Sequence, residues 1–384
     1  MEESNIELIK SYIIEINKEN PLLIVEPNYI QKLYKTIKEK NLSELDECWK
    51  HIDSILLSLQ LQRSGVTYEY CKEDEPNYET IIHQLQNTPQ PEQRTPEWYN
   101  FRYNHLTASN AWKALGTQAM QNELIYEKCQ PLSIEKYNPS LNETPMSWGH
   151  KYEPLTVKIY EHMNNTQITD FGCIEHSKYP FLAASPDGIV TGNINYGRMI
   201  EIKNVVSREI TGIPKKDYYI QMQLQMEVCD LDECDFVETK FIEYDYEEDY
   251  LNDASENRKG VICVFIKNNE SYHYEYMPLD YSGNYLEWLK ETCESKTDDY
   301  VWFRNLFWKL EVYSCVLVKR KREWFQVAVK DLERIWTTIC EERLNGEYIK
   351  RSPKKRETKL KVIKLDEDNR RMELDSLFDF ASEE

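Results

Sequence analysis

Apolar residues recur at helical spacing through the first part of the chain. The stretches "IELIKSYIIEI" and "LDECWKHIDSILLSLQLQ" carry them three and four residues apart, which predicts helices from the start to about residue 63. Pro21 and Pro27 separate these segments, since proline interrupts a helical pattern. The polar, proline-bearing stretch 70–95 is predicted to be a linker around one short helix near 79–87.

From Thr95 onward, helix starts alternate with strand patterns. "TPEWYNFRYNHL" has Thr95 as a helix cap and Pro96 in the first turn. Two further helices are predicted in "TASNAWKAL" and "SWGHKYEPLTVKIYEHMN". Strands follow in "QITDFGCIEHS", "FLAASPDGIV" and "RMIEIKNVV", then a helix in "KDYYIQMQLQMEVC", then strands in "CDFVETKFIEY", "GVICVFIKN" and "SYHYEYMP". This order predicts an α/β core with a mixed central sheet flanked by helices.

The last hundred residues change in character. Helices are predicted in "YSGNYLEWLKETC" and "VAVKDLERIWTTICEERLN", with an aromatic stretch and the basic run "KRKR" (319–322) between them. After Gly346 the chain is first basic and then acidic, which predicts a disordered tail. We therefore predict a helical N-terminal region with a linker over 1–90, an α/β domain with a C-terminal extension over 91–346, and a charged tail over 347–384.

Composition narrows the class of protein. The formal net charge of -20 does not favour nonspecific attraction to nucleic acid, although a partner responds to the local field. The ten cysteines include no CxxC pair, so free thiols are expected in place of a zinc site. The N-terminus has no apolar signal core, and no apolar run reaches the ~18 residues of a membrane span. We expect an intracellular protein without a membrane anchor.

The stretch "AASPDGIVTGNINYGRMIEIK" combines Asp187, Glu201 and Lys203. Its "SPDG" is a turn sequence, and the alternation in "IEIK" places Glu201 and Lys203 on the face opposite Ile200 and Ile202. If the isoleucine face is the core, the charged face is exposed. Taken singly, each motif favours a structural role, namely a turn and a solvated hairpin.

Together, "SPDG" and "IEIK" favour a catalytic metal site over a structural role. Two neighbouring carboxylates repel each other, and a hard divalent ion bound through oxygen removes that repulsion. Mg²⁺ retains water molecules, one of which can attack phosphorus. Lys203 would orient that water and offset negative charge in the transition state.

These residues carry a resemblance to a family. "SPDG…IEIK" resembles the PD-(D/E)xK nuclease superfamily, whose core is restriction-endonuclease-like. The blocks "WYNFRYNHLTAS", "SWGHKYEP", "AASPDGIV", "MIEIKN" and "YYIQMQLQM" follow the order of its lambda-exonuclease-like, viral-recombinase (YqaJ-type) branch. The resemblance spans roughly 95–230, less than half of the chain, and is highly specific over that range.

The resemblance implies a metal site. Asp187 and Glu201 would be direct ligands, the carbonyl of Ile202 a backbone ligand, and Glu153 a further ligand, directly or through water. Without the family, Glu153 would be read as a surface glutamate of a helix. Mg²⁺ is the implied cofactor, with Mn²⁺ as a substitute.

Two side chains would act on the attacking water. Lys203 would position and activate it, and Gln221 would reach the water or Lys203 from the following helix. Gln225 lies one turn further on the same helix face, whereas Gln223 points elsewhere. The alternative for these glutamines is a polar, solvated face.

Another block implies recognition of a DNA end. Arg102 and Ser109 match the residues that hold the terminal 5′-phosphate in the family, and a guanidinium with a hydroxyl near a helix N-terminus suits a phosphate. An ion pair and a helix cap are the structural alternatives. Asn104 stands where the family has glycine, and asparagine tolerates a left-handed conformation. Trp98 is expected to serve packing.

Basic residues follow the predicted catalytic strand. Arg208, Lys215 and Lys216 lie in a connection that could follow the DNA backbone or could be a solvated loop, with even weight. The run 319–322 could hold DNA or end a strand, and "RSPKKRETK" resembles a nuclear localisation signal at low specificity.

The implied function is Mg²⁺-dependent resection of double-stranded DNA from 5′ ends to leave 3′ single strands for recombination, repair or viral genome processing. A structure-specific endonuclease or an RNA-cleaving relative on the same core is one alternative. A noncatalytic DNA-end-binding module is another. The implied partners are duplex DNA with free ends and a single-strand annealing or replication protein. Monomers and ring-shaped trimers both occur in the family. The expected location is a viral factory in the cytoplasm or the host nucleus.

Overall fold

The computed structural model describes residues 3–19, 29–39, 61–63, 77–133, 144–255, 258–267 and 271–353. Helices α1 (Glu3–Glu19), α2 (Tyr29–Lys38) and α5 (Tyr78–Asn87) form where helices were predicted. Most of the helix predicted over 45–62 lies outside the described residues. Its end is instead strand β1 (Leu61–Arg63), which pairs antiparallel with β11 (Tyr300–Lys319), so the helical prediction is wrong there. Pairing with a distant strand outweighs the local helical pattern.

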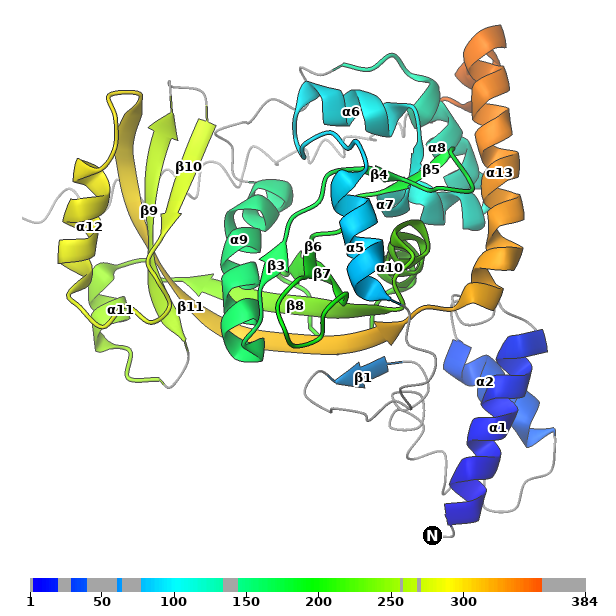
Figure 1. The fold of residues 1–384 in the computed structure, drawn as a ribbon, viewed down its shortest axis with the longest axis horizontal. Helices are drawn as coiled ribbons and strands as arrows, with labels where there is room; N and C mark the ends of the chain where they lie inside the picture. Colours follow the sequence, from blue (N-terminus) through cyan, green and yellow to red (C-terminus); the bar gives the residue numbers. More distant parts are fainter. Residues whose placement is uncertain are drawn as a thin grey trace, which may run out of the picture. The chain divides into compact units, whose positions relative to one another are not determined.

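A mixed sheet forms the centre of the fold (Figure 1). Its strand order is β10-β9-β11-β8-β7-β6-β3, and β1 pairs with β11 outside this path. The strands are β3 (Ile168–Thr169), β6 (Gly188–Val190), β7 (Met199–Asn204), β8 (Glu233–Glu243), β9 (Lys259–Lys267) and β10 (Ser271–Tyr276). β7 and β8 are parallel, and the other pairs of this sheet are antiparallel. The predicted mixed α/β fold is thereby confirmed.

A smaller sheet lies beside it, in the order β2-β5-β4. Its strands are β2 (Leu106–Thr107), β5 (Leu182–Ala184) and β4 (Ile174–Glu175). The helices of this half are α6 (Pro96–Tyr103), α7 (Ala108–Ala111), the 3₁₀ turn η2 (Trp112–Leu115) and α8 (Gln118–Cys129). Thr95 caps α6 as predicted, because its side chain accepts a hydrogen bond from the Trp98 amide.

Helices cover both faces of β7. On one face, α9 (Pro145–Asn164) buries Tyr160 against Ile200 and Ile202. On the other face, α10 (Lys216–Cys229) is the crossover that the parallel pair β7–β8 requires. The charged face of β7 is therefore covered as well, and Glu201 is 0% exposed. An exposed charged face, which a one-sided core would give, is contradicted.

The aromatic stretch before the basic run folds as one twenty-residue strand, β11. Its first half pairs with β9 and its second half with β8, with register shifts after Trp302 and after Leu310. Because the strand is continuous, it ties the β9–β10 hairpin to the central sheet. Helices α11 (Glu247–Asn252) and α12 (Tyr285–Glu294) accompany this hairpin (Figure 1).

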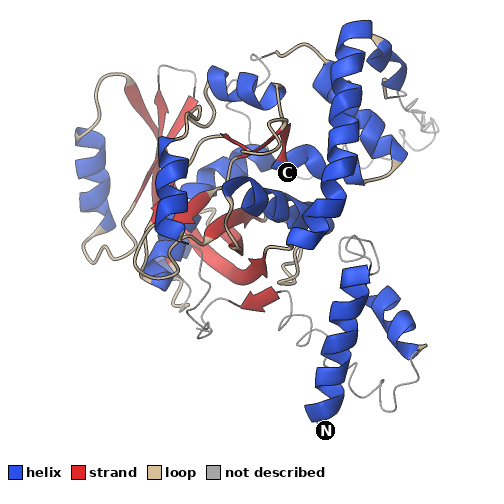
Figure 2. Cartoon of the chain, turned by 45° about the vertical axis from the view of Figure 1, so that its right-hand side comes forward, coloured by secondary structure: helices blue, strands red, loops and turns tan. Residues whose placement is uncertain are grey.

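Helix α13 (Arg322–Asn345) and the turn η4 (Glu347–Arg351) complete the described chain, as Figure 2 shows in a second view. The first compact unit ends at Arg351. The tail beyond residue 353 lies outside the described residues, and the predicted division at 90 and 346 stays a prediction. Among the described helices, none has the length and apolar character that a membrane crossing requires. The eight described cysteines are all free thiols.

Candidate active site

Two neighbouring strands bring the predicted acids together. Asp187 stands directly before β6, and the register Gly188↔Ile200 places it beside β7. One oxygen of Asp187, Oδ2, accepts a hydrogen bond of 2.7 Å from the backbone amide of Ile202. The turn predicted from "SPDG" therefore orients a carboxylate along the strand that carries Glu201 and Lys203.

Glu201 is the buried member of the set. Its Oε2 accepts a 2.7 Å hydrogen bond from Nε2 of Gln225, and its Oε1 contacts Nζ of Lys203. The Lys203 side chain remains 25% exposed, and its ammonium lies over the ring of Tyr218 at 5.1 Å. Burial lowers the pKa of Lys203, but the charges of Glu201 and Asp187 outweigh this and raise it above its usual value, so the side chain stays cationic.

Glu153 approaches from α9. Its Oε1 forms a 2.9 Å ion pair with Nη2 of Arg94. Burial raises the pKa of Glu153, and the negative charge of Glu201 adds to the effect, while Arg94 and Lys203 lower it. Burial also raises the pKa of Asp187 well above its usual range, followed by the charges of Glu201 and then Glu153. These mutual effects place the three acids in one electrostatic cluster, called here the carboxylate centre (Glu153, Asp187 and Glu201, with Lys203).

The donor chemistry of the carboxylate centre fits a hard divalent cation. All side-chain donors are carboxylate oxygens, and their repulsion is what a divalent ion relieves. Within the described residues, however, no three acidic, histidine or cysteine side chains converge into a preformed metal cluster. Glu153 is turned to Arg94, and Glu201 to Lys203 and Gln225. Metal binding by these residues requires Glu153 to leave Arg94 and Oε1 of Glu201 to leave Lys203, while Oε2 of Glu201 can keep its hydrogen bond from Gln225.

The glutamines of α10 lie on two different faces of the helix, as their spacing predicts. Gln223 faces away from the centre: its Nε2 donates to the carbonyl of Lys319, and its Oε1 accepts from the amide of Lys321. Gln225 is the glutamine that contacts Glu201, and it also donates to the carbonyl of Ser185 at 3.3 Å. Gln221 is half-buried one turn earlier, and its predicted role toward the attacking water stays a prediction.

Arg102 and Ser109 meet in the structure. Nη2 of Arg102 donates to Oγ of Ser109 at 2.8 Å, and the guanidinium lies 4.2 Å from the ring centre of Trp98. Trp98 donates through Nε1 to Oγ of Ser185, two residues before Asp187. Trp98 thus does more than pack, since it connects this Arg102–Ser109 pair to the loop of the carboxylate centre.

The turn after α6 needs no glycine. Asn104 caps this helix with φ -86°, an ordinary value, so the left-handed conformation considered for it is not used. Buried Lys128 donates at 2.6 Å to the carbonyls of Arg102 and His105, and Arg343 of α13 donates to the carbonyl of Tyr103. Two basic side chains from distant helices therefore hold the end of α6 that carries Arg102.

The basic residues proposed for the DNA backbone differ in their surroundings. Arg208 pairs with the buried carboxylate of Glu238. Lys215 is exposed directly before α10, and Lys216 is half-buried in its first turn. In the run 319–322, Arg320 is almost buried and pairs with Glu227 at 2.7 Å. A DNA contact is not indicated for Arg320, because its charge is already used inside the fold.

Two residues that contact the carboxylate centre were not singled out as site residues from the sequence. Arg94 stands in a polar linker without periodicity, and nothing in its neighbourhood indicated its pairing with Glu153. It adopts φ 67°, a left-handed conformation that is uncommon for arginine. Gln225 shares the helix face of Gln221, so its spacing was the signal that could have assigned it.

Comparison with known proteins agrees with the order of the sequence blocks. Residues 97–232 match the family model described as a YqaJ-like viral recombinase domain, which confirms the predicted resemblance. The chain is 26% identical over 304 residues to an uncharacterized protein of Acanthamoeba polyphaga mimivirus, covering 68% of this chain and 54% of that protein. The chain thus spans about half the length of this curated relative.

Solved structures of two exonucleases are also similar. The alkaline exonuclease LHK-Exo from Laribacter hongkongensis is 19% identical, with 67% of this chain and 97% of that chain covered and a TM-score of 0.39. A phage-related exonuclease from Haemophilus somnus 129PT is 13% identical, with coverages of 65% and 98% and a TM-score of 0.36.

Proposed function

We propose that this protein is a Mg²⁺-dependent exodeoxyribonuclease that resects double-stranded DNA from 5′ ends. The observation that carries the proposal is the gathering of Asp187, Glu201 and Glu153 around Lys203, with the Arg102–Ser109 pair linked to the same loop through Trp98. The match of residues 97–232 to the viral recombinase model supports a DNA-processing role. The expected viral setting is supported by the mimivirus relative.

The side chains have distinct roles in the proposed hydrolysis. Asp187, Glu201, Glu153 and the carbonyl of Ile202 would hold Mg²⁺, with Mn²⁺ as a substitute. When bound, the ion supplies charge neutralisation and a lowered pKa for water. Lys203 orients the attacking water and stabilises negative charge on phosphorus. Gln225 keeps the buried carboxylate of Glu201 in place through its 2.7 Å hydrogen bond.

The bond changes explain how the Arg102–Ser109 pair would serve repeated cleavage. The water oxygen attacks phosphorus and gives up a proton to solvent. The bond from phosphorus to the 3′ oxygen breaks, and this oxygen takes up a proton from solvent and leaves as the 3′ hydroxyl. The released product is a 5′-mononucleotide, and the remaining strand carries a new 5′-phosphate. Arg102 can hold that phosphate with a charge-assisted hydrogen bond beside the Ser109 hydroxyl. Lys215, Lys216 and Arg208 remain candidates for the backbone further along the duplex.

Digestion of linear duplex DNA labelled at one 5′ or one 3′ end tests the proposal. With Mg²⁺, we expect the 5′ label to be released as mononucleotide while the 3′-labelled strand shortens progressively from its 5′ end. EDTA should stop the reaction. Internal fragments from circular DNA would favour the endonuclease alternative. Preferential cleavage of RNA would favour the RNA-cleaving relative, and tight end binding without cleavage the noncatalytic module.

The proposed biological role follows from the product. A 3′ single strand is the substrate of annealing, so a single-strand annealing or replication protein is the partner we propose, in recombination, repair or viral genome processing. Size-exclusion chromatography with light scattering would separate a monomer from a ring-shaped trimer.

A further inference from the structure

Helix α6, which carries Arg102, is held by little apolar burial. It is eight residues long, and none of its side chains is fully buried. At its start, the Thr95 side chain caps the helix, and Nε1 of Trp98 donates to Oγ of Ser185. A short helix without a buried face depends on polar contacts for its place in the fold, so the contacts at its other end help to decide where Arg102 lies.

Arg343 of α13 binds that other end. Its Nη2 donates at 2.7 Å to the carbonyls of Tyr103 and Lys128, and its Nε donates to the carbonyl of Lys128 at 2.9 Å. The guanidinium also lies 4.2 Å from the ring centre of Tyr103. Tyr103 ends α6, and Lys128 stands in the last turn of α8, where carbonyls lack helical partners and a cation is favourable. One side chain therefore joins the C-terminal ends of two helices.

Lys128 extends this link to Arg102 itself. Buried Lys128 donates through Nζ at 2.6 Å to the carbonyl of Arg102 and, at the same distance, to that of His105. Arg343 thus acts on Arg102 along two routes, through the neighbouring residue Tyr103 and through the backbone of Lys128. Both routes consist of hydrogen bonds to backbone carbonyls, so they fix the main chain from which the Arg102 guanidinium extends.

Ser109, the other member of the pair, is placed by different forces. It belongs to α7, where Ala108 and Ala111 are buried in the core. Nη2 of Arg102 reaches Oγ of Ser109 at 2.8 Å. A displaced end of α6 would therefore move Arg102 while Ser109 stays, and the guanidinium and the hydroxyl would no longer meet at one phosphate. The geometry of the pair is only as precise as the contacts that hold α6.

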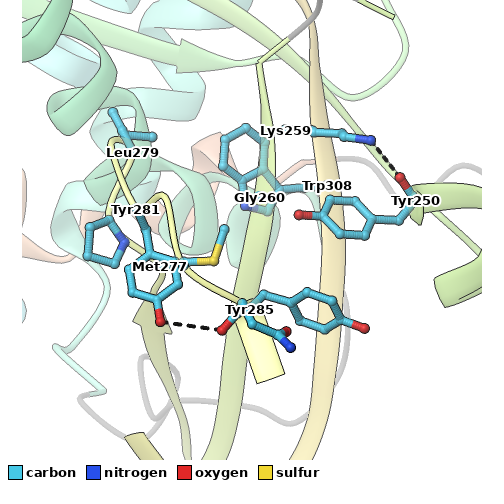
Figure 3. A pocket seen from close by; sticks show the side chains of 11 residues that line it. Tyr250, Lys259, Gly260, Met277, Leu279, Tyr281, Tyr285 and Trp308 are labelled. Carbon is cyan, nitrogen blue, oxygen red and sulfur yellow. Dashed lines mark hydrogen bonds between the residues drawn. The ribbon is translucent and has the colours of Figure 1, made fainter. Parts of the chain in front are cut away.

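The link from α13 comes from outside the matched domain, since α13 lies beyond residues 97–232. The β9–β10 hairpin region is also outside this range, and beside it lies a pocket of about 290 Å³ (Figure 3). The hydrogen bonds drawn there, from Lys259 to the carbonyl of Tyr250 and from Tyr281 to that of Asn284, stay within the region itself. Arg343 instead donates to the matched domain, at the helix that carries the end-recognition pair.

We propose that Arg343 is a positioning residue for recognition of the DNA end: by fixing the end of α6, it keeps the Arg102 guanidinium beside Ser109 for a 5′-phosphate. This role rests on the proposed function, because it requires Arg102 to bind that phosphate. Arg343 makes its hydrogen bonds to backbone carbonyls and acts through Arg102. Loss of Arg343 should therefore weaken recognition of the phosphate and leave the carboxylate centre unchanged.

DNA binding measured by fluorescence anisotropy in EDTA tests this role without cleavage. The full chain is titrated with a labelled DNA hairpin that has one blunt end, carrying either a 5′-phosphate or a 5′-hydroxyl. The Kd for the hydroxyl end divided by the Kd for the phosphate end is called here the phosphate preference. Arg343→Met removes the guanidinium but keeps an apolar side chain of similar length. It should lower the phosphate preference about threefold to tenfold, with the affinity for the hydroxyl end unchanged.

Arg343→Lys is the variant that decides if Arg343→Met does not fold. It keeps the positive charge but cannot reproduce the planar fork that binds two carbonyls, so it should lower the phosphate preference at least about twofold. Arg351→Met is the matched control, because Arg351 is also part-buried and its Nε and Nη2 donate to Glu342 of α13 at 2.8 and 2.6 Å, not to α6. This control should lower thermal stability and keep the phosphate preference.

A double variant shows whether Arg343 acts through Arg102. In an Arg102→Ala background, Arg343→Met should cause no further loss of the phosphate preference, whereas the same loss in both backgrounds would overturn the proposal. An unchanged preference in the folded Arg343 variants, beside a loss in Arg102→Ala, would reject the role of Arg343 and leave the proposed function intact. An equal loss in Arg351→Met would also reject it. A wild-type protein without any phosphate preference would instead reject the role of Arg102, and that of Arg343 with it.

Discussion

The carboxylate centre and the Arg102–Ser109 pair differ in charge and in how they are assembled. The centre is mainly acidic and comes from separate segments, whereas the pair carries a cation and comes from neighbouring residues. The centre gathers acids from α9, the end of one loop and β7, and each acid is compensated by a different group of the chain. The pair comes from one continuous block, with Arg102 on the last turn of α6 and Ser109 in the first turn of α7. Loss of one charge should therefore disable the centre, whereas loss of the pair should change which DNA ends are preferred.

The largest effect is expected from Glu201→Gln and Lys203→Ala. Each should reduce Mg²⁺-dependent cleavage by about 10²-fold or more while DNA binding remains, because the first removes a ligand charge and the second removes the cation beside the water. Single-turnover assays and filter binding measure both. Lys203→Ala leaves a buried carboxylate without its ammonium, so its thermal unfolding must be compared with wild type. Exposed Glu209→Gln is the control. Near-normal turnover by either variant would show that the substituted residue is not part of the active site.

Arg102→Ala should have the next largest effect, and it should be selective. We expect the preference for 5′-phosphorylated over 5′-hydroxyl ends to fall by about tenfold to a hundredfold, which corresponds to one charge-assisted hydrogen bond. Basal cleavage should persist, because the carboxylate centre is intact. Arg334→Ala on the exposed face of α13 is the control. If the wild-type protein shows no such preference, the inferred 5′ polarity is wrong.

Substitutions of Gln221 and Gln225 in α10 separate a role in cleavage from a role in stability. Gln225→Ala should lower both thermal stability and cleavage, about tenfold in rate, because a buried hydrogen bond to Glu201 is lost. Gln221→Ala should lower cleavage without a loss of stability if Gln221 acts on the attacking water. Unfolding curves and single-turnover rates of both variants decide. If Gln221→Ala cleaves at the wild-type rate, Gln221 has no role in cleavage and Gln225 alone of these two glutamines supports it.

A smaller effect is expected at Arg94, whose guanidinium pairs with the carboxylate of Glu153. If Arg94 competes with the ion for this carboxylate, Arg94→Gln should lower the Mg²⁺ concentration for half-maximal cleavage about two- to fivefold, as befits a partly exposed ion pair. A Mg²⁺ titration of the initial rate measures it. An increased Mg²⁺ requirement would show that Arg94 supports the site in place of competing for it.

The smallest effect on cleavage is expected at Lys128, whose test is stability. Burial lowers its pKa to about 7, assisted by the charges of Arg102 and Arg343. Between pH 7 and the ordinary lysine value of 10.5, the unfolded chain binds more protons, so the free energy of unfolding should rise with pH, by at most about 1.4 kcal/mol per pH unit. Denaturant titrations at several pH values should show this slope in wild type and lose it in Lys128→Met. A wild-type profile with the opposite slope would contradict the depressed pKa.

Local sequence was sufficient for several parts of this fold. The cap of α6, the crossover helix α10 and the strands around Asp187 and Glu201 follow from caps, periodicity and turn residues that lie within a few positions of each other. Arg102 and Ser109 were singled out by the family resemblance, and the residues alone left an ion pair and a helix cap as the alternatives. By contrast, β1 formed where a helical pattern was read, since its backbone groups pair with residues about 255 positions away.

By itself, the sequence determined the α/β order, the shared strand face of Glu201 and Lys203, and the separation of Gln223 from Gln225, because these depend on periods of two and 3.6 residues. The place of Glu153 in the centre was implied by the family resemblance alone. Only the tertiary structure decided that Glu201 is buried on both sides of its strand, that Arg94 meets Glu153, and that β11 joins the two halves of the sheet. Each of these depends on contacts between segments far apart in the chain. Such contacts form only when apolar burial brings the segments together, and no local pattern encodes which distant partner will be met.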